Sequence, residues 1–285
     1  RVWEIIMREN VMNIGDIEIL SISDGKLEFD ICEFFPSIPD ESWDQYRGHL
    51  TEDNKVSFNL ASFFLRSDGK NVLVDTGMGP RSPRHPDAPW GELMDDMKRY
   101  DINPTDVDLV IMTHAHRDHI GWNLTQENGN SVPTFPNARY CLSYKDWEAC
   151  HNPDLIRDRF PNAERCVWPL QELGLIDFLD EDTSITSELK AIATPGHTPG
   201  HFSIQISSGG ETGIILGDVL HNAAQLQEMD WSSRADIDPD LARETRHSIV
   251  NLIEANDYKV LAGHLPSPGF GKIIRLNGKR YWQGF

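Results

Sequence analysis

The stretch Thr113-His114-Ala115-His116-Arg117-Asp118-His119 decides how this 285-residue chain is interpreted. It places three imidazoles and a carboxylate within six positions, directly after the apolar run at residues 107–113. Neutral imidazole and carboxylate are the ligands that divalent metals such as zinc prefer. A tight loop that leaves a strand can direct such ligands toward two adjacent ions. The alternative is a solvated polar loop whose histidines have no joint role.

Five β-type runs end in a residue that could bind or orient a metal, and the run before His114 is one of them. The other four end at Asp75, His197, Asp218 and His264. Strand ends at one edge of a sheet are where α/β proteins gather their chemistry. The five endings therefore predict one shared site.

Strand and helix patterns alternate along the chain, which indicates an α/β layered fold. Strands are expected at residues 17–22, 58–65, 71–74, 107–113, 189–194, 212–216 and 259–262. Asp24-Gly25 reads as a turn, and helical spacing predicts helices at 93–100 and 239–258. The second helix is expected to bury Leu241, Ile249, Leu252 and Ile253.

Residues 34–54 show no clear helix or strand pattern and contain Pro36, Pro39 and several acids. A stretch of this length is unusual as a plain connection inside a compact domain. We therefore expect it to act as a lid or, together with the N-terminal segment, as an arm of a homodimer.

These motifs resemble the signature of the metallo-β-lactamase superfamily, His-x-His-x-Asp-His followed by separate His, Asp and His ligands. The likeness covers nearly the whole chain, from Asp75-Thr76-Gly77 through residues 194–201 and Gly217-Asp218 to Gly263-His264. It implies an α/β fold of the αβ/βα sandwich type. In that fold two mixed sheets lie face to face with helices on the outer faces. Residues 1–285 would form a single domain.

The same resemblance implies two divalent metal ions held by seven residues. One ion would be held by His114, His116 and His197, the other by Asp118, His119 and His264, and Asp218 would bridge the two. Zn²⁺ is the expected metal for such ligands, while Mn²⁺, Fe²⁺ and Co²⁺ accept similar ones.

The carboxylates of Asp218 and Asp75 bear on the function and on the orientation of the ligands. The best-known dizinc β-lactamases carry a Cys at the position of Asp218, which argues against true β-lactam hydrolysis. Asp75 resembles the carboxylate that orients a ligand imidazole from behind. A turn-forming Asp before Thr-Gly explains that residue equally well.

Within the superfamily the chain is similar to the branch that holds methyl parathion hydrolase and N-acyl-homoserine lactonases. Residues 116–123, 217–221 and 262–271 carry this likeness. It implies a hydrolase of the lactonase, arylesterase or organophosphate hydrolase type, in which a metal-bridging hydroxide attacks lactones or carboxylic or phosphoric esters. Asp118 would orient that hydroxide or carry a proton to the leaving group. A metal-dependent oxidoreductase, a β-lactamase and a non-catalytic binding protein are the alternatives on this fold.

Three residues near the expected metal site are candidates for the substrate pocket: Trp122, His221 and Phe270. His221 follows Asp218 by three positions and could face the substrate as a proton donor. Packing in the core is the competing explanation for all three. Phe34 is a further candidate wall, and we expect His201 only to support the ligand loop.

The amino-acid composition limits the kinds of binding partner and the cellular location that are expected for this chain. The 45 acidic and 26 basic residues give a net charge of −19, which excludes a nucleic-acid binder that relies on overall basic charge. No apolar run reaches the roughly 18 residues of a membrane helix. Four cysteines without C-x-x-C spacing fit a reducing compartment. We therefore expect a cytoplasmic protein whose partner is a small-molecule ester, lactone or phosphotriester.

Overall fold

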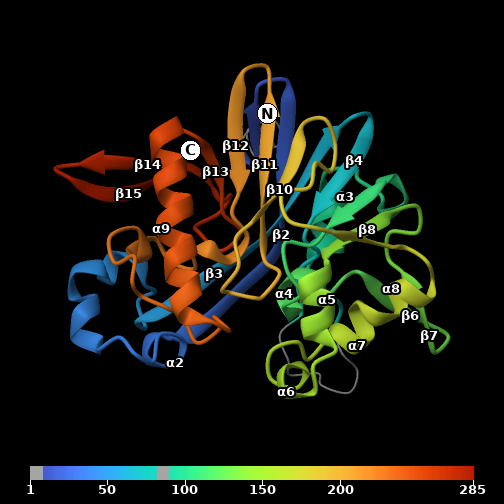
Figure 1. Cartoon of the computed structure of the whole chain (residues 1–285), viewed down its shortest axis with the longest axis horizontal. Coiled ribbons are helices and arrows are strands. Elements are labelled where there is room, and N and C mark those ends of the chain that lie inside the picture. Colours follow the sequence, from blue (N-terminus) through green and yellow to red (C-terminus); the bar gives the residue numbers. More distant parts are fainter. Residues whose placement is uncertain (1–8, 82–89) are drawn as a thin grey trace.

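Two sheets lie face to face at the centre of the molecule, and helices cover their outer faces (Figure 1). The computed structural model describes residues 9–81 and 90–285. The first sheet has the order β1-β2-β3-β4-β5-β8-β9 and the second β10-β11-β12-β13-β14-β15. The expected αβ/βα sandwich is confirmed.

The strands of the first sheet are β1 Val11–Ile14, β2 Ile17–Asp30, β3 Lys55–Ser67, β4 Lys70–Val74, β5 Leu109–Ile111, β8 Arg139–Ser143 and β9 Ile176–Leu179. Those of the second are β10 Leu189–Ala193, β11 Phe202–Ser208, β12 Glu211–Ile215, β13 Lys259–Leu261, β14 Phe270–Leu276 and β15 Lys279–Gly284. A separate hairpin pairs β6 Leu124–Glu127 with β7 Asn130–Pro133.

The α-helices are α2 Ile31–Phe34, α3 Leu93–Arg99, α4 Arg117–Ile120, α5 Tyr144–Cys150, α6 Pro153–Ile156, α7 Ala163–Cys166, α8 Trp168–Glu172 and α9 Pro239–Asn256. The 3-10 helices are η1 Asp40–His49, η2 Pro104–Asp106, η3 Gly217–Val219 and η4 Ala223–Leu226.

The main core lies between the two sheets. Phe63 and Leu65 of β3 pack there in one cluster with Phe202 and Ile204 of β11. Alternating side chains of a strand point to opposite faces, so the other faces of the strands are free to pack on helices. A second cluster joins the first sheet to α3 and α5, and a third joins the second sheet to α9.

Helix α9 begins and ends on recognisable caps. The Asp238 side chain accepts a hydrogen bond from Leu241 N at 3.0 Å, and Asp257 ends the helix in the left-handed region at φ 52°. Its buried face carries Ala242, Arg246, Ile249, Val250 and Ile253.

The burial expected for α9 was half wrong. Ile249 and Ile253 are buried, but Leu252 is 38% exposed and Leu241 is only half-buried. The buried stripe passes through Ala242 and Arg246 because Arg246 donates to the carbonyls of Val219, Met229 and Trp231.

No helix in residues 9–81 or 90–285 is long and apolar enough to cross a bilayer.

Asp24-Gly25 is not a turn, which corrects the sequence prediction. Strand β2 runs through this position, with a register shift against β3 between Ser23 and Lys26. Such a bulge re-aims a side chain, and here Asp24 becomes buried. Its carboxylate accepts hydrogen bonds from Met78 N at 2.5 Å, Leu93 N at 2.6 Å and Trp122 Nε1 at 3.0 Å.

Residues 34–54 are more ordered than the sequence pattern predicts, because η1 occupies most of them. Trp43 is fully buried, with its ring 4.7 Å from that of Trp231 and 5.2 Å from that of Phe35. The aromatic residues of this segment therefore pack on their own chain. A lid or dimer role stays a prediction, and residues 1–8 of the proposed dimer arm lie outside the described residues.

The buried Asp24 predicts a pH-dependent stability. Burial raises its pKa to about 7, against hydrogen bonds that lower it. Because the folded state then holds this proton more tightly than the unfolded state, Asp24 lowers the free energy of unfolding as the pH rises from about 4 to about 7. The full shift corresponds to about 4 kcal/mol as an upper bound.

Urea unfolding of wild type and Asp24→Asn between pH 4.5 and 8 measures this contribution. The stability of wild type minus that of the variant should decrease across the interval, because Asn does not titrate. A difference that stays constant with pH would contradict the assignment.

Candidate metal centre

The five strand ends singled out in the sequence meet at one edge of the two sheets. Asp75 directly follows β4, and His114 lies three residues after β5. His197, Asp218 and His264 follow β10, β12 and β13 in the same way. The structure thus brings together the residues that the sequence predicts to share a site.

Asp75 contacts both ends of the loop that carries the predicted ligands, residues 113–119. Its Oδ1 accepts a hydrogen bond from Thr113 N at 2.8 Å, and its Oδ2 lies 2.9 Å from His119 Nδ1. The Thr113 hydroxyl also donates to Oδ2 at 2.9 Å. These contacts fix the orientation of the His119 ring, as expected for a carboxylate behind a metal ligand.

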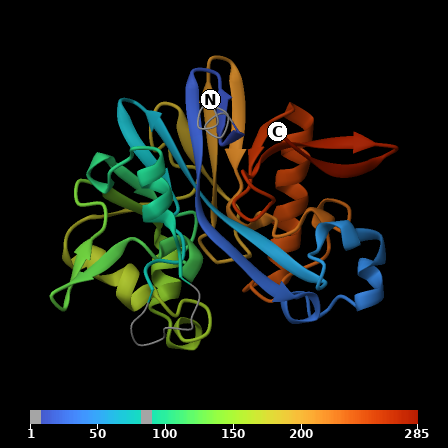
Figure 2. The ribbon, with the colours of Figure 1, turned by 180° about the vertical axis from the view of Figure 1, so that it is seen from behind.

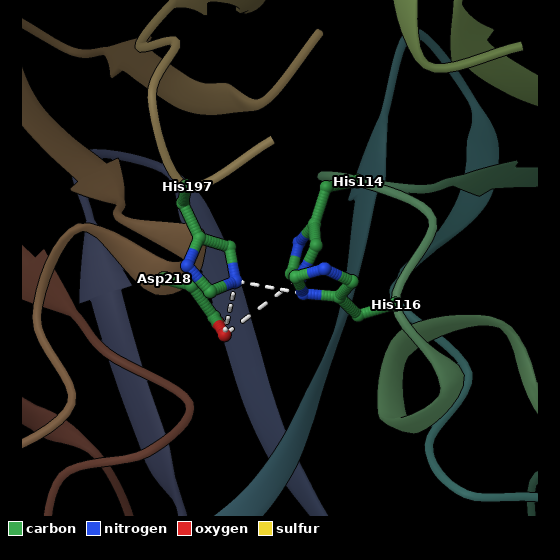
Figure 3. Close-up of side chains that lie close together, drawn as sticks. All are labelled: His114, His116, His197 and Asp218. Atoms are coloured by element: carbon green, nitrogen blue, oxygen red, sulfur yellow. Dashed lines mark hydrogen bonds and ion pairs between the residues drawn. The ribbon is translucent and has the colours of Figure 1, made fainter. Parts of the chain in front are cut away.

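Seven side chains form two groups in which one ligand-type atom of each residue lies within 4.8 Å of the others. The first group is His114, His116, His197 and Asp218, and the second is Asp118, His119 and His264. Figure 3 shows the first group, whose side chains point toward one another from the segments that follow β5, β10 and β12. His116 Nδ1 lies 2.8 Å from His197 Nε2, and His197 Nε2 lies 3.2 Å from Asp218 Oδ2.

Asp218 links the two groups. Its Oδ1 is 3.3 Å from His119 Nε2, and its Oδ2 is 3.1 Å from His264 Nε2. The backbone before it requires glycine, since Gly217 has φ +58° and a Cβ there would lie 2.4 Å from His201 Nε2. Asp218 N donates to that same nitrogen at 2.8 Å. His201 therefore supports this part of the site.

Charge is concentrated in this buried cluster. Burial would raise the pKa of Asp218, yet the imidazoles of His264 and His119 hold it well below its usual range. Burial opposes the protonation of His197, but Asp218 and Asp236 raise its pKa to about 9. Burial lowers the pKa of His114 and His116 well below the usual value. These two rings are neutral, which is the form that binds metal.

The donor set fits divalent metal ions. The Nε2 atoms of His114 and His119 are buried and have no hydrogen-bond partner in the described residues, a costly state for polar atoms. Their Nδ1 atoms are held, by Thr113 Oγ1 at 3.0 Å and by Asp75. His264 Nδ1 is likewise held, by the carbonyl of Asn59 at 3.0 Å. A free inner nitrogen and an anchored outer one are typical of a metal ligand.

A family model described as the Metallo-beta-lactamase superfamily matches residues 59–264, a span that includes all seven residues of the two groups. The chain belongs to the metallo-β-lactamase superfamily. Among its curated relatives, N-acyl homoserine lactonase AttM of Azorhizobium caulinodans is 24% identical over 251 residues, which span 78% of this chain and 89% of that protein. N-acyl homoserine lactonase of Bacillus cereus is 24% identical over 231 residues, 75% of this chain and 84% of that protein.

Solved structures of the same fold superpose on nearly the whole chain. The crystal structure of hydrolase AbOPH in the beta lactamase superfamily aligns with a TM-score of 0.83 and 25% identity over 96% of both chains. AidC, a dizinc quorum-quenching lactonase in complex with a product, aligns with a TM-score of 0.82 and 22% identity over 96% of both chains.

Two buried carboxylates escaped the sequence analysis of this metallo-β-lactamase fold. Asp236 Oδ1 lies 2.9 Å from His197 Nδ1 and so orients that ring. Asp146 of α5 accepts from Ala115 N at 2.9 Å and Gly200 N at 2.7 Å, which joins the His114–His116 loop to the loop after His197. Asp236 follows no strand, and Asp146 lies three residues after β8, a strand that the sequence pattern did not predict. Neither residue stands in a motif, so the sequence carried no local signal for them.

The candidate pocket residues lie in different surroundings. A cavity of about 970 Å³ opens over the two metal groups, and Phe34 and His221 line it. Trp122 and Phe270 are not among its lining residues. Trp122 packs against the core and donates to Asp24, while Phe270 is 2% exposed between the sheets, with its ring 5.9 Å from that of Phe63. For these two residues the structure favours the core-packing explanation.

The contact between Asp236 and His197 predicts a metal-binding role for a residue that is not a ligand. Asp236→Asn should weaken metal affinity by about 10- to 100-fold, because partners behind a metal ligand contribute that much. Metal titration with a competing chelator measures the change. Asp230→Asn is the matched control, since Asp230 is exposed and its ion pair among the described residues is with the exposed His247. Equal affinity in the two variants would contradict the role of Asp236.

Proposed function

We propose that this chain is a metal-dependent hydrolase that opens lactones and cleaves carboxylic or phosphoric esters. The observation that carries the proposal is the pair of ligand groups joined by Asp218 at the floor of the cavity. The names of the curated relatives, N-acyl homoserine lactonases, support the choice of lactones and esters. Two Zn²⁺ ions are the expected cofactors because the ligands are imidazoles and carboxylates.

Two divalent ions held by these groups would lower the pKa of a shared water and polarise a carbonyl or phosphoryl oxygen. The protein's own part begins with Asp118, which lines the cavity. Its Oδ2 is 3.6 Å from His264 Nε2 and 3.8 Å from His119 Nε2. Asp118 is thus placed to accept a proton from the attacking water and to pass it to the leaving oxygen.

His221 is the second side chain with a role toward the substrate. Both of its ring nitrogens are buried and have no hydrogen-bond partner in the described residues, although Nε2 lies 3.3 Å from Asp218 Oδ2. The ring lines the cavity beside the two metal groups. It can therefore donate a hydrogen bond to an oxygen of the bound ester and so orient the scissile bond.

One wall of the cavity is apolar and reaches the metal groups. Phe34 lies 4.6 Å from Phe58 and 5.4 Å from His221, measured between ring centroids. Phe58 in turn lies 5.2 Å from His264. This wall can hold the acyl or aryl part of an ester and exclude water from the reacting centre.

A substrate panel tests the proposal. Purified protein loaded with Zn²⁺ should hydrolyse an acyl-homoserine lactone and an aryl ester. A phosphotriester and a β-lactam are assayed in parallel, and their rates are compared with those of the first two substrates. A chelator should abolish turnover, and added Zn²⁺ should restore it. Asp218→Ala and His116→Ala should each lower kcat/KM by about 10³-fold or more, because they remove ligands that support several kcal/mol of transition-state stabilisation.

His247→Ala is the matched histidine control, since His247 is exposed and, within the described part of the chain, pairs with exposed Asp230. It should retain wild-type turnover. Hydrolysis that persists in chelator, or in Asp218→Ala, would refute a metal-dependent mechanism. Turnover of the β-lactam alone would refute the substrate class.

A further inference from the structure

The cavity contains two guanidinium groups that form no ion pair with a carboxylate of the described residues. Arg117 and Arg159 both line it, and both are half-buried. Arg159 donates from Nη1 to the carbonyl of Arg234 at 2.6 Å, a neutral acceptor, and forms no ion pair within residues 9–81 and 90–285. Arg117 has no hydrogen-bond or ion-pair partner in the described part of the chain. A half-buried arginine without a protein partner keeps its N–H donors available to an anionic ligand.

This arrangement contrasts with the other arginine at the cavity. Arg234 pairs with Glu33 at 2.6 Å and lies over the Phe29 ring at 5.2 Å. Arg117 forms no such pair with the residues that the structure describes, although acidic residues outnumber basic ones 45 to 26 in the chain. Unpaired positive charge is therefore kept inside this cavity of a strongly acidic protein.

The acidic residues of the cavity do not remove this charge. Asp118 and Asp218 belong to the two metal groups, where divalent ions would more than offset them. Glu28 and Asp158 also line the cavity, but both are exposed at its edge. Exposed charges are screened by water and salt. The interior of the cavity thus favours an anion.

We propose that the substrate is an ester or lactone that carries a separate anionic group, a carboxylate or a phosphate, which binds to Arg117 with Arg159 beside it. The apolar part of the substrate would lie against Phe29, Phe34 and Phe58, which line the same cavity. A guanidinium suits this task because its fork of N–H donors matches both carboxylate and phosphate oxygens. The inference rests on the proposed hydrolase function and adds the class of substrate.

Arg117 and residues of both metal groups line the same cavity. In sequence Arg117 stands between His116 and Asp118, one residue from each metal group. A short dicarboxylic half-ester, which carries an anionic group and a scissile ester in one small molecule, is therefore a suitable probe.

The test compares two aryl esters of the same acyl length: mono-4-nitrophenyl glutarate, which is anionic, and 4-nitrophenyl pentanoate, which is neutral. Zn²⁺-loaded wild type should have the higher kcat/KM for the glutarate ester. Arg117→Gln should lower the ratio of the two kcat/KM values by about tenfold or more, as expected for loss of a charge-assisted hydrogen bond. Arg117→Lys should recover part of the ratio. The control Arg66→Gln alters an exposed arginine of β3 that does not line the cavity, and it should leave the ratio unchanged.

A binding measurement separates this inference from the proposed function. Calorimetry measures the binding of pentanoate, glutarate and 4-phosphonobutyrate. Each ligand has one carboxylate that can bind at the metal groups, and only glutarate and 4-phosphonobutyrate carry a second anionic group. Tighter binding of glutarate than of pentanoate identifies a carboxylate as the anionic group. Tighter binding of 4-phosphonobutyrate identifies a phosphate. Arg117→Gln should abolish the gain in affinity in either case. Lack of turnover of both esters would contradict the proposed function alone. Equal binding of all three ligands, or a ratio unaffected by Arg117→Gln, would overturn the inference.

Discussion

The carboxylate of Asp218 is the constraint on which the rest of the site depends. It is buried within 3.1–3.3 Å of ring nitrogens from His119, His197 and His264. A buried carboxylate is stable only when cationic or hydrogen-bonding partners surround it. Because these partners come from both sheets, the two halves of the sandwich must pack in one register for the cluster to form. The metal centre can therefore form only when the two sheets are packed together.

The supports behind the ligands show how that register is fixed. His119 is held by Asp75 at the end of β4, His264 by the carbonyl of Asn59 in β3, and His197 by Asp236 ahead of α9. Each ligand is thus oriented by an element other than its own, and β3 of the first sheet holds a ligand that follows β13 of the second. A shift of one sheet against the other would misplace several ligands at once.

The sequence predicted the residues whose position follows from a local pattern. It did not predict the residues whose role depends on contacts with distant parts of the chain. Ligands that directly follow apolar strands could be predicted because parallel strand ends meet at one edge. Asp236 and Asp146 could not, since their partners lie 39 and 31 to 54 residues away and neither occurs in a motif. The dipeptide Asp24-Gly25 has the composition of a turn, but pairing with β3 overrides that local preference and turns Asp24 inward. Trp122 lies close to the ligands in sequence, yet its side chain packs away from the cavity.

The parts that bind metal and the parts that shape the cavity have different origins in the chain. The family match covers residues 59–264 and so includes every residue of the two metal groups. Phe29, Phe34 and Phe58, which form the apolar wall, all lie before it, on or beside the long β2–β3 pair that extends away from the other strands (Figure 2). Within the match, Arg117 occupies a variable position of the His-x-His-x-Asp-His signature. Membership of the superfamily therefore accounts for the reactive centre, whereas the choice of substrate depends on residues that the shared signature does not specify.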